Sequence, residues 1–284
     1  MLRVSARAVD FSMSRPLLFP TLLSLLLLLA ACASPALEAP YASGDEDPRN
    51  AFRAPDASGE PDADLVEEWT YSILVAEFAG HRGELDTASS YYLQAARLTR
   101  DPEVIERAIR VALTAEDNPK AVQGARLLTE VQPKRADAFR LLAVAYLRSG
   151  DVGQTVQALD RVIALDPGNA SESFAVAAAI LSGEDDQKRA WRAMQSLVGH
   201  HGHDAEAHLA LARLGARWQR FDDALAALAE AQRLRPGWDD AQLLQAQIQV
   251  LQGEAEQATA TMLAGVEANP DNAGMRRFYG QLLL

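Results

Sequence analysis

The stretch that decides the fold is residues 136–169, which read ADAFRLLAVAYLRSGDVGQTVQALDRVIALDPGN. Its first half places Phe139, Leu142 and Tyr146 three or four residues apart, which is the spacing of one helical face. Gly150 then interrupts the pattern, and glycine readily takes the positive φ that a helix end requires. A second helical pattern follows and stops at Pro167, because proline cannot continue a helix. The stretch therefore predicts two helices joined by a tight turn.

The same hairpin pattern recurs along the chain. Pro102, Pro133, Pro167, Pro236 and Pro270 are separated by 31, 34, 69 and 34 residues, so one mark is missing from an otherwise regular series. A period of 34 residues is that of the tetratricopeptide repeat (TPR), a helix–turn–helix unit. Such units stack on their neighbours, since one hairpin cannot bury its apolar face alone. We therefore predict an all-α, right-handed superhelical TPR solenoid, with units 69–101, 102–135, 136–169, 171–204, 205–238 and 239–272.

A seventh unit is expected to start at Ala273, where the pattern of a first helix begins again. The chain stops at Leu284, before a turn or a second helix, and its last residues are apolar. A terminal solenoid helix normally carries a polar outer face, because no further repeat covers it. We expect the sequence to be a fragment of a longer protein; the alternative is that this short helix caps the sixth unit.

Composition and charge agree with a helical protein and exclude some partners. The 284 residues are 49% hydrophobic but only 6% aromatic, and alanine and leucine, which favour helices, dominate the second half. The formal net charge is −12 and the pI is about 4.9. An acidic surface lacks the electropositive footprint of a nucleic-acid-binding protein, so we expect no nucleic-acid partner.

The first 31 residues have the pattern of an export signal. Arg3, Arg7 and Arg15 form a positive segment, and residues 17–31 are mostly apolar. An apolar helix of that length spans roughly 22 Å, which is short of the ~30 Å hydrocarbon core of a membrane. The segment therefore predicts a signal peptide rather than a transmembrane helix. Translation from either Met1 or Met13 is compatible with this pattern.

The signal ends in Leu29-Ala30-Ala31-Cys32, which resembles the lipobox of bacterial lipoproteins. Cys32 is the only cysteine of the chain, so it has no partner for an intramolecular disulfide. We predict cleavage before Cys32 and acylation of its thiol; the alternative is an ordinary signal peptide with an incidental cysteine. Ala33 follows the cysteine in place of aspartate, and this indicates a lipid-anchored protein on the periplasmic face of the outer membrane.

A tether is predicted to follow the lipidated cysteine, over residues 32–64. The segment is rich in alanine and acidic residues, and its apolar residues show no helical or alternating period. Such a segment buries too little surface to offset its ordering entropy. It also contains five prolines: Pro35, Pro40, Pro48, Pro55 and Pro61. We expect a disordered tether that leads into the solenoid of residues 65–284.

An arginine set marks the candidate partner-binding groove. In TPR proteins the first helix of each unit lines a concave groove, with positions 2, 5, 9, 12 and 13 pointing into it. At such positions the sequence places Arg110, Arg140, Arg148, Arg213 and Arg217. Because guanidinium groups pair with carboxylates, the groove is predicted to bind an acidic protein segment or a chain terminus. The alternative is a solvated helix face whose arginines pair with neighbouring acids.

The sequence contains no recognisable catalytic constellation. It has no Gly-x-Ser-x-Gly elbow, no phosphate loop and no His-Glu-x-x-His motif. His200, His201, His203 and His208 lie close together near Asp204, and imidazoles so spaced are potential metal ligands. We interpret them as a polar turn between repeats. The protein is therefore expected to be no enzyme and to hold no metal or cofactor.

Two segments carry a more specific resemblance. Residues 70–80 (TYSILVAEFAG) and 101–108 (DPEVIERA) are similar to the start of a family of long proteobacterial TPR lipoproteins. A member of that family is the lipoprotein partner of a periplasmic carboxy-terminal processing protease. The resemblance implies an outer-membrane adaptor that assembles with the protease and presents cell-wall hydrolases to it.

We therefore predict a non-enzymatic protein–protein interaction scaffold on the periplasmic side of the outer membrane. Two alternatives remain open. In one, the repeats are the targeting arm of a longer enzyme. In the other, the protein is an envelope-assembly lipoprotein without a protease partner.

Overall fold

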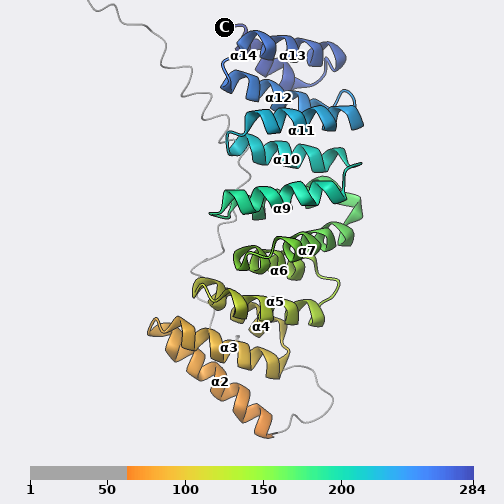
Figure 1. The fold of residues 1–284 in the computed structure, drawn as a ribbon. Helices are drawn as coiled ribbons and strands as arrows, with labels where there is room; N and C mark the ends of the chain where they lie inside the picture. Colours follow the sequence, from red (N-terminus) through yellow and green to blue (C-terminus); the bar gives the residue numbers. More distant parts are fainter. Residues whose placement is uncertain (1–62) are drawn as a thin grey trace, which may run out of the picture. The chain divides into compact units, whose positions relative to one another are not determined.

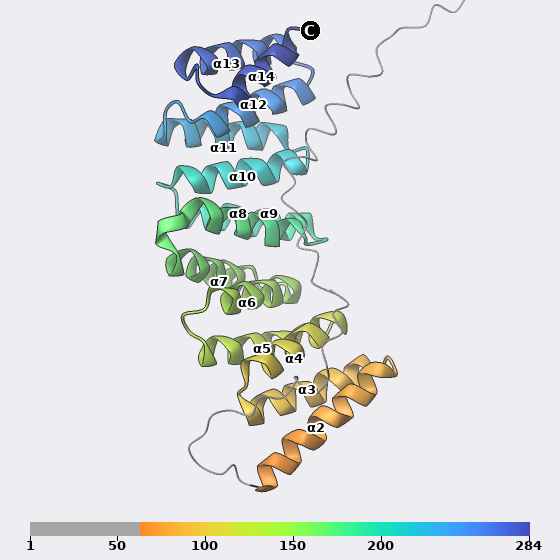
Figure 2. The same cartoon turned by 180° about the vertical axis from the view of Figure 1, so that it is seen from behind.

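The structure, a computed structural model, describes residues 63–284, all within one compact unit. These residues form thirteen α-helices and one 3₁₀ turn, and no strand occurs among them. Figures 1 and 2 show consecutive helices lying next to one another in a single row from α2 to α14. Between Ala63 and Leu284, no helix combines the length and the apolar character needed to cross a membrane.

The helices pair into six hairpins followed by one further helix. The hairpins are α2 (Ala63–His81) with α3 (Leu85–Thr99), α4 (Pro102–Thr114) with α5 (Asn118–Val131), α6 (Ala136–Ser149) with α7 (Val152–Leu165), α8 (Ala170–Ser182) with α9 (Gln187–His200), α10 (Ala205–Arg217) with α11 (Phe221–Leu234), and α12 (Asp239–Leu251) with α13 (Ala255–Ala268). The turn η2 (Pro167–Asn169) precedes α8, and α14 (Ala273–Leu282) follows the last hairpin.

This architecture confirms the predicted all-helical stack of TPR hairpins. Five of the six predicted units begin at, or one residue after, the start of a first helix. The first unit differs, because α2 begins at Ala63, six residues before Trp69 and two before the predicted start of the body. The signal, lipobox and nearly all of the tether lie outside the described residues.

Acidic residues and asparagine begin several helices by capping them. The Asp101 carboxylate accepts hydrogen bonds from the backbone N–H groups of Glu103 and Val104, and Pro102 fills the first helical position of α4. Four further helices begin with a side-chain cap of the same kind, made by Asp117, Asp151, Asp186 and Asn272. Each cap satisfies a backbone donor that has no partner within the helix. These residues recur near the hairpin boundaries, which is why the boundaries could be read from sequence.

The turn inside the third hairpin depends on Gly150. This residue ends α6 with φ +87°, a left-handed conformation that residues with a Cβ rarely adopt. Its N–H donates to the carbonyl of Leu147, and the next N–H, of Asp151, donates to that of Tyr146. The reversal is therefore complete within two residues, which brings α7 back along α6.

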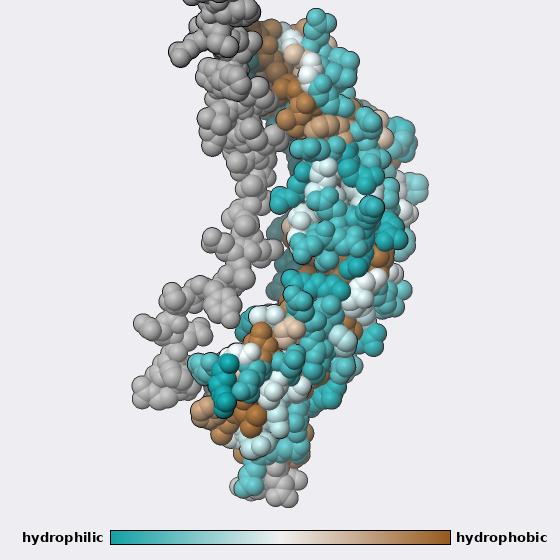
Figure 3. Space-filling view, turned by 60° about the vertical axis from the view of Figure 1, so that its left-hand side comes forward, coloured by the Kyte–Doolittle hydropathy of each residue, from teal (hydrophilic) through white to brown (hydrophobic). Residues whose placement is uncertain are grey.

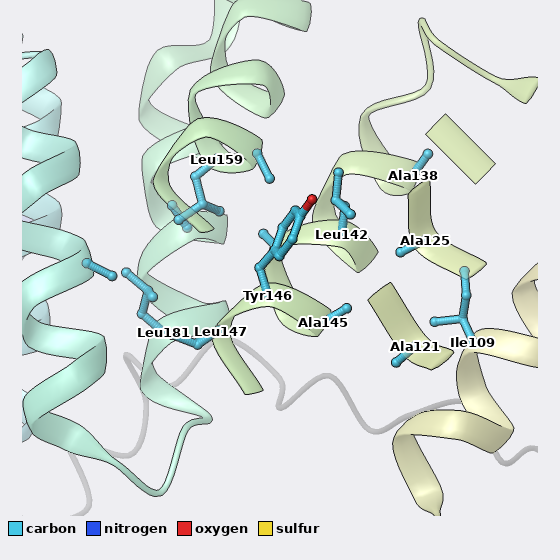
Figure 4. Packing of buried hydrophobic residues seen from close by; sticks show 14 of the residues in the cluster. Ile109, Ala121, Ala125, Ala138, Leu142, Ala145, Tyr146, Leu147, Leu159 and Leu181 are labelled. Carbon is cyan, nitrogen blue, oxygen red and sulfur yellow. The ribbon is translucent and has the colours of Figure 1, made fainter. Parts of the chain in front are cut away.

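Small and large buried side chains alternate where the helices meet. Ala121 and Ala125 on α5 and Ala138 on α6 are fully buried, so the helix backbones approach closely. Leu142 and Tyr146 extend from α6 into the space between its neighbours, as Figure 4 shows. Such interdigitation fills the interior at high density. One buried cluster built in this way continues from α2 to α10, and a second one joins α10, α11 and α12.

A polar contact joins α2, α3 and α4. Arg107 on α4 forms an ion pair with Glu77 on α2, with 2.6 Å between Nη2 and Oε1. The same guanidinium lies 5.2 Å from the ring centre of Tyr92 on α3. Burial, and next its hydrogen bond to Glu77, raise the pKa of the Tyr92 hydroxyl. The tyrosine therefore stays neutral at physiological pH and holds the first two hairpins together.

Candidate protein-binding surface

The first helices of neighbouring hairpins contact one another on one side of the stack. Arg148, near the end of α6, donates from Nη1 to the carbonyl of Leu113 near the end of α4, at 3.2 Å. Asn118 donates in turn to the carbonyl of Arg148 at 3.0 Å. Because the carboxyl ends of α4 and α6 adjoin, the two helices run in the same direction. Residues at equivalent repeat positions therefore form rows across this surface, which we call the first-helix face (α4, α6, α8, α10 and α12).

The structure places the five predicted groove arginines on three of these helices. Arg110 lies on α4, Arg140 and Arg148 on α6, and Arg213 and Arg217 on α10. The helix between the last two groups, α8, has exposed alanines at the corresponding fifth and ninth positions of its unit, namely Ala175 and Ala179. The basic set is therefore split in two by an uncharged stretch, which the summed sequence positions did not reveal.

Three of the five arginines already have partners. Arg140 pairs with Asp137 on its own helix at 2.9 Å, and its buried Nε has no hydrogen bond among the described residues. Arg148 is engaged with the end of α4 as described above. Arg213 lies 3.9 Å from a carboxylate oxygen of Asp240 on α12. For Arg140 and Arg213 this is the pairing with neighbouring acids that the alternative interpretation anticipated.

Arg110 and Arg217 are different. Both side chains are exposed, and neither has an ion pair or a side-chain hydrogen bond within residues 63–284. Their guanidinium groups are therefore free to bind an outside carboxylate. The groove assignment as a whole stays a prediction, and these two arginines are its strongest members.

Carboxylates form a second row that the sequence analysis did not single out. The second position of five consecutive units is acidic, and these residues lie in the first turns of α4, α6, α8, α10 and α12: Glu103, Asp137, Glu172, Glu206 and Asp240. Negative charge is favourable there because it faces the positive end of the helix dipole. Since α4 and α6 run in parallel, the face has an acidic edge and, at Arg148 and Arg217, a basic edge. The repeat register would have shown this row had acids been tabulated with the arginines.

The histidine cluster has an ordered structure. His200 is the last residue of α9 rather than part of the loop. The Nδ1 atom of His200 and the Nε2 atom of His201 lie 2.8 and 2.9 Å from the two carboxylate oxygens of Asp160 on α7. Asp204 approaches the other nitrogen of His201 at 3.4 Å. No group of metal-ligating geometry is found among the described residues. The contacts attach the end of α9 to α7 across the repeat boundary.

Comparison with known proteins identifies the repeat. A family model described as tetratricopeptide repeat matches residues 107–170 and 219–273. Together with the helical hairpins, these matches define the class: the chain is a tetratricopeptide-repeat protein.

One curated relative extends the likeness along most of the chain. It is the TPR repeat-containing protein PA4667 of Pseudomonas aeruginosa, which is 27% identical over 260 residues, or 91% of this chain. The aligned region covers 43% of that relative, so the chain spans less than half of its length.

Two solved structures are similar in fold. A tetratricopeptide repeat protein from Parabacteroides merdae is 14% identical, with a TM-score of 0.36, over 79% of this chain and 87% of that one. YrrB, described as a TPR protein with an unusual peptide-binding site, is 16% identical, with a TM-score of 0.37, over 66% of this chain and 97% of that one.

Proposed function

We propose that this protein is a non-enzymatic scaffold that binds other proteins on its first-helix face. TPR repeats are interaction modules, and the chain carries at least the two matched groups of them. The observation that supports the choice of face is the pair of exposed guanidinium groups of Arg110 and Arg217, which have no acidic partner within residues 63–284. Arginine binds carboxylates in a bidentate manner, so the favoured ligand is an acidic protein segment or a carboxyl terminus.

We further propose that the scaffold is anchored by lipid to the periplasmic face of the outer membrane. The support is the sequence Leu29-Ala30-Ala31-Cys32 after an apolar segment. Two or more acyl chains on Cys32 would give a stable anchor, because each buried methylene contributes about 0.8 kcal/mol. The finer proposal, an adaptor for a periplasmic carboxy-terminal processing protease, rests on the resemblance of residues 70–80 and 101–108.

A charge-reversal experiment tests the binding face. The full chain with Arg110→Glu and Arg217→Glu is compared with a control that carries Arg192→Glu and Arg233→Glu. The control residues are exposed on the second helices α9 and α11. Both variants change the net charge by the same amount, so long-range repulsion is matched. Exposed substitutions usually alter the free energy of unfolding by no more than ~0.5 kcal/mol, so both variants should keep the wild-type helical circular dichroism.

The partners are recovered by crosslinking each variant in the native envelope and identifying the captured proteins. We expect the wild type and the control to capture a carboxy-terminal processing protease or its substrates, and the first-helix-face variant to lose them. Equal capture by all three proteins would contradict binding at this face. Capture of envelope-assembly proteins without any such protease would contradict the adaptor and favour the envelope-assembly alternative.

The anchor has its own test. Cells that express the wild type or the Cys32→Ser variant are fed an alkyne-bearing fatty acid, and the protein is examined for label and membrane fraction. We expect the wild type to be labelled and to fractionate with the outer membrane, and the variant to be unlabelled and uncleaved. A labelled variant, or a variant that still matures and reaches the outer membrane, would contradict the lipobox assignment.

A further inference from the structure

The first helix, α2, is apolar on two opposite faces. One face is buried against the rest of the stack and includes Ile73 and Ala76. The opposite face exposes Tyr71, Leu74 and Phe78, whose exposed fractions are 59%, 53% and 70%. A helix that is apolar all round is normally buried on all sides. Figure 3 shows hydrophobic surface at this end of the stack, the lower end of the view, where α2 lies in Figure 1.

The repeat register explains what this exposed face is. Tyr71, Leu74 and Phe78 occupy the third, sixth and tenth positions of the unit that starts at Trp69. Interior first helices use these three positions to pack on the preceding hairpin. On α10 they are Ala207, Ala210 and Leu214, with exposed fractions of 0%, 3% and 2%, in the same buried cluster as residues of α9. The exposed face of α2 is therefore a stacking face without a neighbour among the described residues.

The charges at the ends of this face indicate what covers it. Glu67, Tyr71, Leu74, Phe78 and Arg82 follow one another at spacings of four, three, four and four residues, which is close to the seam of a coiled coil. The seam is acidic at its amino end, apolar in the middle and basic at its carboxyl end. Arg82 has only a local pair with Glu84 at 3.1 Å, and its side chain is 74% exposed, so it is available for another carboxylate.

We propose that the α2 seam binds the α2 seam of a second copy of this chain, antiparallel and about a two-fold axis at its middle. That axis sets Tyr71 against Phe78 of the second copy and Glu67 against Arg82 of the second copy, and it repeats both contacts by symmetry. A seam whose ends carry opposite charges is complementary to itself only in this orientation. Two-fold, isologous pairing is also the commonest form of assembly among soluble proteins.

The expected dimer is weak. One pair of helices buries less surface than the ~1,200 Å² at which specific, stable interfaces begin. We therefore expect a dissociation constant in the micromolar range, and the oligomeric state has to be measured over a range of concentrations that extends to about 100 μM.

The test uses the full chain in a detergent matched to the density of the solvent, so that sedimentation reports the mass of the protein alone. We expect a monomer–dimer equilibrium for the wild type. The double variant Leu74→Glu with Phe78→Glu should raise the dissociation constant at least ~10-fold, because two apolar anchors become charged. The control is Leu251→Glu with Leu263→Glu, which changes two exposed leucines on α12 and α13 and should leave dimerisation unchanged.

A charge swap tests the antiparallel orientation independently of the apolar contacts. Glu67→Arg alone and Arg82→Glu alone each create like-charge pairs at both ends of the seam, so we expect each to raise the dissociation constant about 3-fold. The chain with both changes restores opposite charges at each end and should dimerise like the wild type. A general loss of solubility or stability would not be rescued in this way.

Several results would overturn the proposal. They are a wild type that stays monomeric at every concentration, a dimer that survives Leu74→Glu with Phe78→Glu, and a double charge swap that fails to rescue the single changes. In the monomeric case, hydrogen exchange identifies the true occupant of the seam. Slow exchange over α2 would indicate that residues 1–62 cover it, and fast exchange would indicate a binding site for a different protein.

Discussion

Helices α2 and α10 hold the same place in their hairpins, yet the structure treats the same three positions of each in opposite ways. At the third, sixth and tenth positions α10 has Ala207, Ala210 and Leu214, all buried, whereas α2 has larger side chains that are mostly exposed. Both helices are anchored on their other side by buried alanines, Ala212 on α10 and Ala76 on α2. The difference therefore lies in the neighbour and not in the helix. Stability in a solenoid belongs to the contact between repeats, so a substitution at one register position should have effects that depend on where the repeat stands.

The largest expected effect comes from removing the same kind of side chain at the tenth position of each helix. Leu214→Ala leaves a cavity in the buried cluster and should lower the free energy of unfolding by about 2–5 kcal/mol. Phe78→Ala removes a larger but 70% exposed side chain and should change it by no more than ~0.5 kcal/mol in the monomer. Both are measured by urea unfolding followed by circular dichroism at a protein concentration low enough to exclude dimers. Equal losses would mean that α2 is covered in solution.

The second contrast concerns one substitution with two signs. A methyl group added at Gly124 on α5 would lie 2.9 Å from a side-chain carbon of Ile109 on α4, so Gly124→Ala should destabilise the chain by about 1–3 kcal/mol. No atom lies within 4 Å of the same addition at Gly80 on α2. There Gly80→Ala should stabilise the chain by about 0.5–1 kcal/mol, because alanine loses less backbone entropy in a helix. Unfolding midpoints of the two variants should move in opposite directions, and a shared direction would contradict the close approach of α4 and α5.

The third contrast compares helix caps in the first and second hairpins. Asp101 caps α4 through two backbone N–H groups, so Asp101→Ala should cost about 1 kcal/mol. Glu84 stands at the same place before α3 but makes no capping hydrogen bond, so Glu84→Ala should cost only a few tenths of a kcal/mol. Hydrogen exchange at the start of each helix gives the local effect. Faster exchange at α3 than at α4 after these changes would contradict the assignment of the caps.

The smallest expected effect concerns the ion pair that joins α2 to α4. Arg107 and Glu77 are 45% and 33% exposed, so solvent screens their attraction, and Arg107→Gln should cost about 0.2–1 kcal/mol. A double-mutant cycle with Glu77→Gln isolates the pair. Because the attraction is screened by ions, the coupling should fall as salt is added. A coupling that is independent of salt would indicate that packing of the arginine stem on Tyr92 is responsible instead.

The sequence by itself determined the repeat. The period of 34 residues, the acidic residues and prolines at helix starts, and Gly150 at a turn are local features, and each acts within a few residues along the chain. They predicted the hairpin boundaries closely and identified buried residues such as Leu142, Tyr146 and Leu159. The same local rules also predicted a signal and a lipidated Cys32, which lie outside the described residues and stay predictions.

Only the tertiary structure decided which side chains have partners. Arg148 bonds to the end of α4, Arg213 lies near Asp240 on α12, and Asp160 on α7 binds His200 and His201 from α9. Each of these contacts crosses from one hairpin to the next, between residues about one repeat apart, and depends on how the helices stack. The period predicts which positions face a neighbour, but it contains no information on whether a neighbour is present or which rotamer a long side chain adopts. For that reason the arginine set was found from sequence, while its division by α8 and the open seam of α2 appeared only in three dimensions.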